Sequence, residues 1–199
     1  VYKRQVIYDM AMSLNLLWDD DRIDNRKIYS AGWSLGGTAS LFNAWLPLQE
    51  ALNRPGASFA GYLMWYPGCL ALPDLNLWDD DLMQIYIGEE DNWTPPQPCK
   101  ELVTQINADG GNAFIELYPN SFHSFDGPLP LRLIPDAYSW ANCKLKVNAE
   151  TKKVYDPDNV FLDFSDPKLR RQAYESCAVK GEVMAGCLLY TSPSPRDLH

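Results

Sequence analysis

The feature that most constrains this chain is the Gly-x-Ser-x-Gly motif of Gly32, Ser34 and Gly36, which follows a short apolar stretch beginning at Ile28. A strand that turns sharply into a helix around such a serine is a nucleophile elbow. Glycine suits both flanking positions, because a larger side chain two residues from the serine would clash with neighbouring backbone. The turn also places the Leu35 N–H at a helix N-terminus, where it can donate to an oxyanion. The motif also occurs in strand–turn–helix segments that have no catalytic role. Whether Ser34 is a nucleophile therefore depends on finding a base and an orienting carboxylate elsewhere in the chain.

Helical and strand patterns alternate around this motif. Apolar residues at helical spacing predict helices over residues 3–18, 38–52 and 96–107. Apolar runs predict strands buried on both faces before Ser34 and at residues 59–66, 84–87 and 114–118. Strands that alternate with helices indicate an α/β fold with a mainly parallel sheet flanked by helices. In such sheets, functional residues lie in loops at the carboxyl ends of the strands.

A nucleophilic serine needs a base within hydrogen-bond reach and a third group that orients the base. The chain has two histidines. His199 is the last residue, whereas His123 follows the predicted strand that ends at Tyr118. A single histidine is more often structural than catalytic, but this position after a strand favours His123 as the base.

The third group is expected to be a carboxylate after an intervening strand. Asp91 follows the predicted strand at residues 84–87 and is the preferred candidate, with Glu89 and Glu90 as alternatives. The resulting chain order of serine, aspartate and histidine is that of α/β-hydrolases.

Three motifs together resemble the dienelactone hydrolase family of the α/β-hydrolase superfamily. They are Gly32-Trp33-Ser34-Leu35-Gly36-Gly37, Gly88-x-x-Asp91-x-x-x-Pro95 and Tyr118-Pro119-x-x-x-His123-x-Phe125. The resemblance implies that Ser34 is the nucleophile, that His123 is general base and then acid, and that Asp91 orients His123. Because this acyl-enzyme chemistry needs only the serine, the histidine and a backbone N–H, we expect no metal or organic cofactor. Dienelactone hydrolases carry cysteine at the nucleophile position, so Ser34 favours a small ester over a lactone as the substrate.

Two other functions remain open. The elbow motif also suits a prolyl-oligopeptidase-type serine peptidase, although the short stretch between Ser34 and Asp91 favours the esterase. The second alternative is a non-catalytic ligand-binding protein on the hydrolase fold. The presence of all three catalytic residue types argues against it.

The superfamily fold has further strands before the elbow, and one of the loops after them supplies the second oxyanion-hole N–H. We expect the chain to be an N-terminally truncated fragment that lacks these strands and this donor, and therefore to be a partial α/β-hydrolase fold with impaired activity.

We expect three segments along the chain. Residues 1–141 form the truncated catalytic domain, and residues 142–186 add a surface hairpin and a helix that starts at Asp166. Residues 187–199 resemble translated sequencing adapter rather than natural sequence, and we expect no function for this tail.

Four cysteines form two plausible pairs, Cys69 with Cys99 and Cys143 with Cys177. Two disulfides would indicate a periplasmic or secreted protein, whereas four free thiols would fit the cytoplasm. The spacing of the cysteines alone does not decide between disulfides and free thiols. No cysteine has metal-ligand spacing with a histidine, so no zinc site is expected.

Aromatic residues flank each predicted catalytic residue. Trp33, Trp93 and Phe122 are candidates for an apolar substrate pocket, with core packing as the alternative. The net charge of −9, from 26 acidic and 17 basic residues, argues against nucleic acid as a partner. No apolar run approaches the length of a membrane span. The expected partner is a small-molecule ester or lactone, and the oligomeric state is left open.

Overall fold

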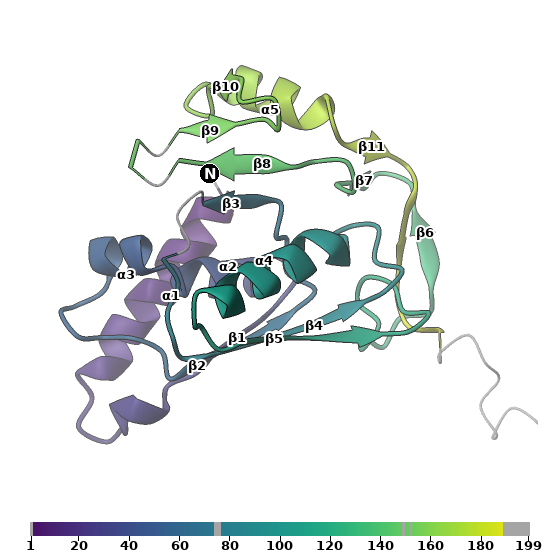
Figure 1. The fold of residues 1–199 in the computed structure, drawn as a ribbon. Coiled ribbons are helices and arrows are strands. Elements are labelled where there is room, and N and C mark those ends of the chain that lie inside the picture. Colours follow the sequence, from purple (N-terminus) through teal and green to yellow (C-terminus); the bar gives the residue numbers. More distant parts are fainter. Residues whose placement is uncertain (1, 74–76, 149, 152, 189–199) are drawn as a thin grey trace, which may run out of the picture. The chain divides into compact units, whose positions relative to one another are not determined.

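The computed structural model, drawn in Figure 1, describes residues 2–73, 77–148, 150–151 and 153–188. The chain divides into two compact units. The first unit comprises Val1–Cys69, Leu75–Tyr86 and Cys99–Glu116, and the second comprises Leu70–Asp74, Ile87–Pro98 and Leu117–His199. The chain passes from one unit to the other at each of these boundaries.

Most helices belong to the first unit. They are α1 (Tyr2–Trp18), the 3₁₀ helix η1 (Asn25–Lys27), α2 (Leu35–Asn43), α3 (Leu46–Leu52) and α4 (Pro96–Ala108), whose first three residues belong to the second unit. The predictions for residues 3–18 and 96–107 are confirmed. Ala11 and Leu14 of α1 are fully buried and Asp9 is exposed, as an amphipathic helix requires. The buried face of α1 packs against α2.

The prediction of one helix over residues 38–52 is wrong, because two helices cover this stretch. Helix α2 starts at Leu35, directly after Ser34, and α3 starts at Leu46 after the extended backbone of Trp45. Pro47 gives the physical reason. Its ring would clash with the carbonyl of Asn43 in a continuous helix, whereas the first turn of a new helix accommodates proline.

The sheet that lies mainly in the first unit contains the four predicted strands. They are β1 (Ser30–Trp33), β2 (Gly61–Trp65), β4 (Leu82–Gly88) and β5 (Ala113–Tyr118), in the order β1-β2-β4-β5. Strands β4 and β5 each have their last two residues in the second unit. Strand β1 pairs in parallel with β2, and β2 pairs in parallel with β4. The predicted α/β class with a mainly parallel sheet flanked by helices is therefore confirmed. Strand β1, which carries the serine motif, lies at one edge of this sheet.

The two faces of this sheet differ in burial. On β2, Tyr62 and Met64 are fully buried, whereas Leu63 and Trp65 are only half-buried. The prediction that this strand is buried on both faces is therefore wrong. It is also wrong for β1 and β5, where Trp33 and Phe114 are exposed. On the less covered face, Trp65 stacks between Trp33 of β1 and Tyr86 of β4, with ring centroids 4.8 Å apart in both pairs. These rings cover one another across the three strands, which explains how a half-exposed face holds large aromatic residues.

The second unit contains short strands and one helix. Its elements are β3 (Ala71–Pro73), β6 (Arg132–Ile134), β7 (Tyr138–Ser139), β8 (Leu145–Val147), β9 (Val154–Tyr155), β10 (Phe161–Leu162), α5 (Pro167–Glu175), β11 (Val179–Lys180) and β12 (Val183–Ala185). Four of the strands form a sheet in the order β10-β9-β8-β3, and Figure 1 shows α5 beside β10. Strands β11 and β12 pair separately with β7 and β6.

The predicted hairpin and the predicted helix are both present in the second unit. Strands β8 and β9 are antiparallel, and Lys146 lies opposite Tyr155. Helix α5 begins after Asp166, whose carboxylate accepts the backbone N–H of Lys168 as an N-cap. The domain boundaries after residues 141 and 186 stay predictions.

Both cysteine pairs form disulfides. Cys69–Cys99 lies within the first unit and connects the loop after β2 to α4, whereas Cys143–Cys177 lies within the second unit. Cys187 is the free cysteine, and it is buried. Its backbone N–H donates to the Leu129 carbonyl oxygen. The remainder of the predicted adapter-like tail, residues 189–199 with His199, lies outside the described residues.

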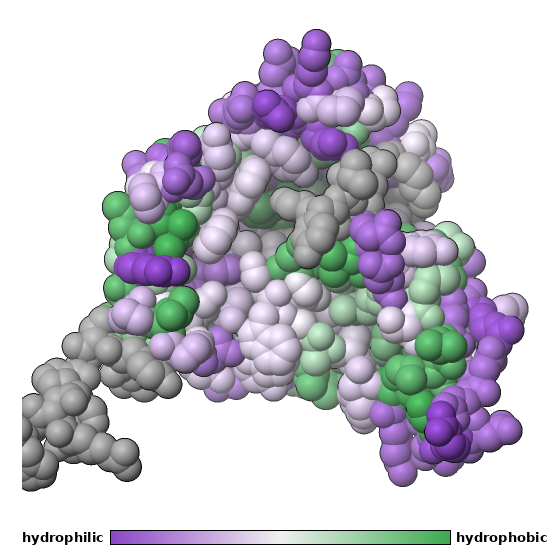
Figure 2. All heavy atoms as spheres, turned by 180° about the vertical axis from the view of Figure 1, so that it is seen from behind, coloured by the Kyte–Doolittle hydropathy of each residue, from purple (hydrophilic) through white to green (hydrophobic). Residues whose placement is uncertain are grey.

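Polar and apolar side chains are mixed on the surface. Figure 2 shows one face, on which hydrophilic side chains surround separate hydrophobic patches. Exposed large apolar residues occur in each unit, for example Leu16 and Tyr29 in the first and Leu133 and Val160 in the second. None of the helices in the described residues combines the length and apolar character that a membrane span needs.

Candidate active site

Ser34 lies in the first unit, at the tight connection between β1 and α2. Its backbone has φ 52° and ψ −113°, a left-handed conformation that a residue with a side chain rarely adopts. Two hydrogen bonds hold this turn: the Ser34 N–H donates to the Trp65 carbonyl at 2.9 Å, and the Thr38 N–H donates to the Ser34 carbonyl at 2.9 Å. Leu35 is the first residue of α2, so its N–H has no carbonyl partner within the helix.

Glycines allow this turn to be so tight, although not at both positions that the motif suggests. A Cβ on Gly32 would lie 2.2 Å from the Gly36 carbonyl carbon, and one on Gly37 would lie 2.8 Å from the Trp65 carbonyl oxygen. A Cβ on Gly36 would meet nothing within 4 Å. The prediction of a steric need is therefore confirmed for Gly32 and wrong for Gly36, because position 36 lies in the first turn of α2 and points to open space.

Asp91 and His123 meet in the second unit. Asp91 follows β4, His123 follows β5, and the His123 Nδ1 atom lies 2.8 Å from Asp91 Oδ2. Both side chains are almost completely buried, at 2% and 0% relative exposure for His123 and Asp91. The rings of Trp93 and His123 are in contact at a centroid distance of 4.8 Å. A buried carboxylate bonded to Nδ1 is the arrangement that orients a histidine for base catalysis at Nε2.

The loop between β4 and Asp91 approaches the loop that carries His123. The Glu89 N–H donates to the Tyr118 carbonyl and the Glu90 N–H to the Ser121 carbonyl, both at 3.0 Å. Gly88 permits this approach, because a Cβ there would lie 2.1 Å from the Ser121 oxygen. Glu89 and Glu90 are exposed, so of the three acidic residues considered from the sequence, Asp91 is the one that contacts His123.

Four hydrogen bonds fix the Asp91 carboxylate. Oδ1 accepts the backbone N–H groups of Trp93 at 2.9 Å and Thr94 at 2.8 Å. Oδ2 accepts the Thr94 hydroxyl at 3.1 Å as well as the His123 contact. The Thr94 hydroxyl is also 3.1 Å from His123 Nδ1. Thr94 therefore contacts both residues of the pair, and the sequence pattern did not predict this contact.

Residues 182–186, which include β12, form hydrogen bonds to both loops of this pair. The Asn92 side chain donates to the Glu182 carbonyl at 2.7 Å and accepts the Met184 N–H at 3.0 Å. The Gly186 N–H donates to the His123 carbonyl at 2.7 Å. Neither Asn92 nor β12 was predicted from the sequence, because a strand of three residues has no periodic pattern. An asparagine next to the predicted acid was the one available signal.

The three predicted pocket residues have different environments. Trp33 is about half exposed and belongs to the stack on the first unit's sheet. Trp93 contacts His123, and Phe122, which precedes His123 in the sequence, is half-buried. Trp93 is thus a predicted pocket residue that directly contacts the Asp91–His123 pair.

A cavity of about 390 Å³ lies elsewhere in the first unit. It is an open groove between α1 and the start of β1, with Met10, Leu14 and Tyr29 among its lining residues. Ser34 does not line it, so this groove is not a pocket for the serine.

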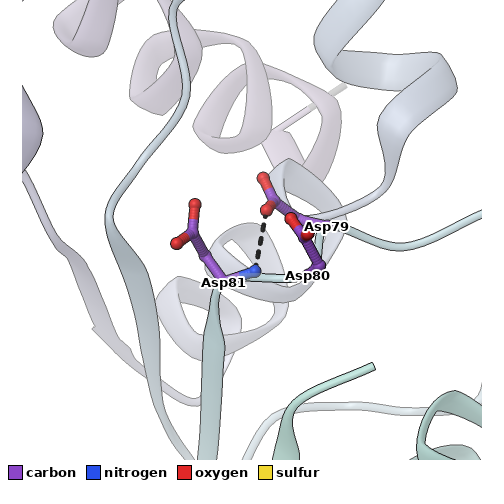
Figure 3. A group of neighbouring side chains, drawn as sticks. All are labelled: Asp79, Asp80 and Asp81. Carbon is purple, nitrogen blue, oxygen red and sulfur yellow. Dashed lines mark hydrogen bonds between the residues drawn. The ribbon is translucent and has the colours of Figure 1, made fainter. Parts of the chain in front are cut away.

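Three consecutive aspartates before β4 bring their carboxylates within 4.8 Å of one another, the closest approach to a metal-ligand cluster among the described residues (Figure 3). Asp79 is buried and already hydrogen-bonded. Its Oδ2 accepts the Tyr62 hydroxyl and the Gln49 side chain, both at 2.7 Å, and its Oδ1 accepts the Asp81 N–H at 3.0 Å. These bonds give Asp79 a structural role in anchoring the segment before β4 to β2 and α3.

Several solved structures are similar to this chain. Esterase 2 of Thermogutta terrifontis matches with a TM-score of 0.49 and 16% identity, over 60% of this chain and 55% of that one. An α/β-hydrolase enzyme from a Medee basin deep-sea metagenome library matches with 0.47 and 17%, over 60% and 50%. A carboxylesterase from Lactobacillus plantarum matches with 0.48 and 14%, over 60% and 55%. The chain spans about half the length of these structures. No protein-family model and no curated protein matches the sequence.

Proposed function

We propose that this protein is a serine-dependent hydrolase of small carboxylic esters that works through an acyl-enzyme intermediate. The observation that carries the proposal is the strained backbone of Ser34 between a strand and a helix. A conformation of this kind costs about 1–3 kcal/mol, and such conformations cluster at active sites. The resemblance of the three sequence motifs to dienelactone hydrolases points to the same chemistry.

In the proposed reaction, the Ser34 hydroxyl oxygen attacks the ester carbonyl and its proton passes to Nε2 of His123. The Leu35 N–H donates to the oxyanion that forms on the carbonyl oxygen. His123 then protonates the leaving alcohol as the ester bond breaks, which leaves an acyl group on Ser34. A water molecule then gives a proton to His123 and attacks the acyl carbon. The bond from that carbon to the Ser34 oxygen breaks, and the oxygen takes the proton back from His123, which releases the acid and restores the serine.

Asp91 has the supporting role in this proposal. Its carboxylate holds the ring through Nδ1 and stabilises the imidazolium that forms after each proton transfer. The proposal requires Nε2 of His123 to come within hydrogen-bond distance of the Ser34 hydroxyl. Ser34 belongs to one unit and the Asp91–His123 pair to the other. Turnover that depends on all three residues is therefore the test of whether they act together.

The experiment is hydrolysis of p-nitrophenyl acetate by the protein with any residues that precede Val1 in its natural chain. We expect Ser34→Ala and His123→Gln each to lower kcat/KM at least about 1,000-fold, and Asp91→Asn to lower it by a similar factor. Ser13→Ala is the matched control, because Ser13 is an exposed serine on α1 whose hydroxyl bonds only its own helix backbone. Turnover that survives Ser34→Ala contradicts the proposal. Ester binding without turnover by the unaltered protein favours a ligand-binding function instead.

A further inference from the structure

Thr38, in the first turn of α2, connects the serine turn to the loop that follows β2. Its hydroxyl oxygen accepts the Gly68 N–H at 2.8 Å and donates to the Ser34 carbonyl oxygen at 3.1 Å. All three residues belong to the first unit. A hydroxyl has one proton to donate, so that of Thr38 forms a hydrogen-bonded relay from the Gly68 N–H to the Ser34 carbonyl.

The contact with Gly68 distinguishes Thr38 from other helical threonines. A threonine hydroxyl often donates to the carbonyl four residues earlier in a helix, so this bond does not by itself indicate a role. Thr104 of α4 shows the plain case, because its exposed hydroxyl donates to the carbonyl four residues earlier at 2.9 Å. The Thr38 hydroxyl also accepts from Gly68, 30 residues further along the chain. Gly68 is itself anchored, since the disulfide from the adjacent Cys69 to Cys99 attaches this loop to α4.

The relay ends on the peptide group that carries the proposed oxyanion donor. The Ser34 carbonyl and the Leu35 N–H belong to one planar trans peptide group, so they point in opposite directions. The same carbonyl also accepts the Thr38 N–H at 2.9 Å, and the two donors together fix the plane of this peptide group. Hydrogen bonds in a chain polarise one another, so a donor on the carbonyl makes the N–H on the other side a stronger donor.

We infer that Thr38 is a positioning residue, whose hydroxyl orients and polarises the peptide group between Ser34 and Leu35 from the loop after β2. Its catalytic consequence rests on the proposed function, because the Leu35 N–H affects turnover only if an oxyanion forms beside Ser34. The relay itself lies within the first unit and is measurable without turnover.

NMR of the isotopically labelled protein tests the relay directly. Thr38→Val keeps the branched shape and the backbone N–H bond but removes the hydroxyl, whereas Thr38→Ser keeps the hydroxyl. In Thr38→Val we expect the carbonyl ¹³C resonance of Ser34 and the amide ¹⁵N resonance of Leu35 to move upfield. We expect the Gly68 amide to exchange its hydrogen about tenfold faster, and Thr38→Ser to retain the original values. Thr38→Ala replaces Thr38→Val if that variant does not fold, and unchanged resonances and exchange in a folded variant overturn the inference.

Ester turnover is the second readout. We expect kcat to fall about tenfold in Thr38→Val with KM unchanged, which is less than the loss of a whole oxyanion donor because the Leu35 N–H remains. Thr38→Ser should restore kcat. Thr104→Val is the matched control, because it removes a helical hydroxyl that lacks the second contact, and its kcat should be unchanged. A role in stability alone would lower the unfolding temperature of Thr38→Val and leave the kcat of the folded protein unchanged.

The two readouts separate failure of this inference from failure of the proposed function. The predicted NMR changes in a protein without ester turnover support the hydrogen-bonding role of Thr38 and refute the proposed function. Turnover that depends on Ser34, with a kcat that Thr38→Val does not change, refutes the positioning role of Thr38 alone.

Discussion

Replacing Gly32 with alanine tests the structure of the serine turn. A Cβ at this position lies 2.2 Å from the Gly36 carbonyl carbon, 2.3 Å from its oxygen and 2.7 Å from the Gly37 nitrogen. Carbon atoms in contact prefer separations of about 3.5–4.0 Å, so the turn has to open by more than about 1 Å. All three atoms are backbone atoms, and no side-chain rotation relieves the clash.

The expected cost follows from what has to move. Overpacking in a core costs about 1–3 kcal/mol when side chains can adjust. Because the backbone must move here, we expect Gly32→Ala to lower the free energy of unfolding by about 3 kcal/mol or more. Gly36→Ala is the matched control, two residues beyond the serine in the same motif. Its Cβ meets nothing within 4 Å, and alanine favours the first turn of α2, so we expect a gain of about 0–1 kcal/mol.

Urea unfolding, monitored by tryptophan fluorescence, to which Trp33 and Trp65 beside the turn contribute, measures the stability of both variants against the unaltered protein. The predicted order of stability is Gly36→Ala at or above the unaltered protein, with Gly32→Ala well below it. A loss of less than about 1 kcal/mol in Gly32→Ala, or an equal loss in both variants, refutes the geometry of the turn.

Three further changes test other parts of the structure. Asn92→Ala removes the hydrogen bonds to Glu182 and Met184 and is expected to lower the free energy of unfolding by about 1–2 kcal/mol and to speed hydrogen exchange at the Met184 amide. Glu90→Ala, at an exposed neighbour, is the control, and equal exchange rates in both variants contradict this role of Asn92. Burial, together with the nearby Asp79 carboxylate, raises the pKa of Tyr62 far above its usual value of about 10. The resulting stabilisation is fully present below about pH 10 and is lost as the pH rises further, because the unfolded state then releases a proton that the folded state keeps. Between about pH 10 and 11, Tyr62→Phe should therefore lose less stability than the unaltered protein. Equal losses of stability in the two proteins exclude this role of Tyr62. The disulfide between Cys69 and Cys99 closes a loop with a sequence separation of 30, so the double alanine variant is expected to lose about 3–4 kcal/mol, and unchanged thermal unfolding in that variant would show that the disulfide contributes nothing.

The predicted parts of the fold are those with long periodic patterns. Helices α1 and α4 and strands β2, β4 and β5 follow from apolar spacing, which reflects burial on one or both faces. The break between α2 and α3 was also encoded, because Pro47 cannot continue a helix, but the apolar residues on either side of it suggested one helix. The strands of two or three residues in the second unit have no period, and tertiary pairing alone defines them.

The candidate site was predictable where residue type and chain order carry the signal. Ser34, Asp91 and His123 follow strands of one sheet in the order typical of α/β-hydrolases. Thr94 and Asn92 were not predictable, because their roles depend on hydrogen bonds to His123, Glu182 and Met184 that arise only when distant segments fold together. At Gly36 the sequence predicted too much: the motif suggested a steric need for glycine, but a Cβ there would meet nothing within 4 Å.

The most direct test of the central claim is the reaction of the protein with a fluorophosphonate probe, which forms a covalent bond with activated serines. Intact mass should rise by one probe per chain, and peptide mapping should place the probe on Ser34. His123→Gln should slow labelling at least about 100-fold, since the serine then lacks its base. Labelling at another serine, labelling retained in Ser34→Ala, or equal rates with and without His123 would contradict the account.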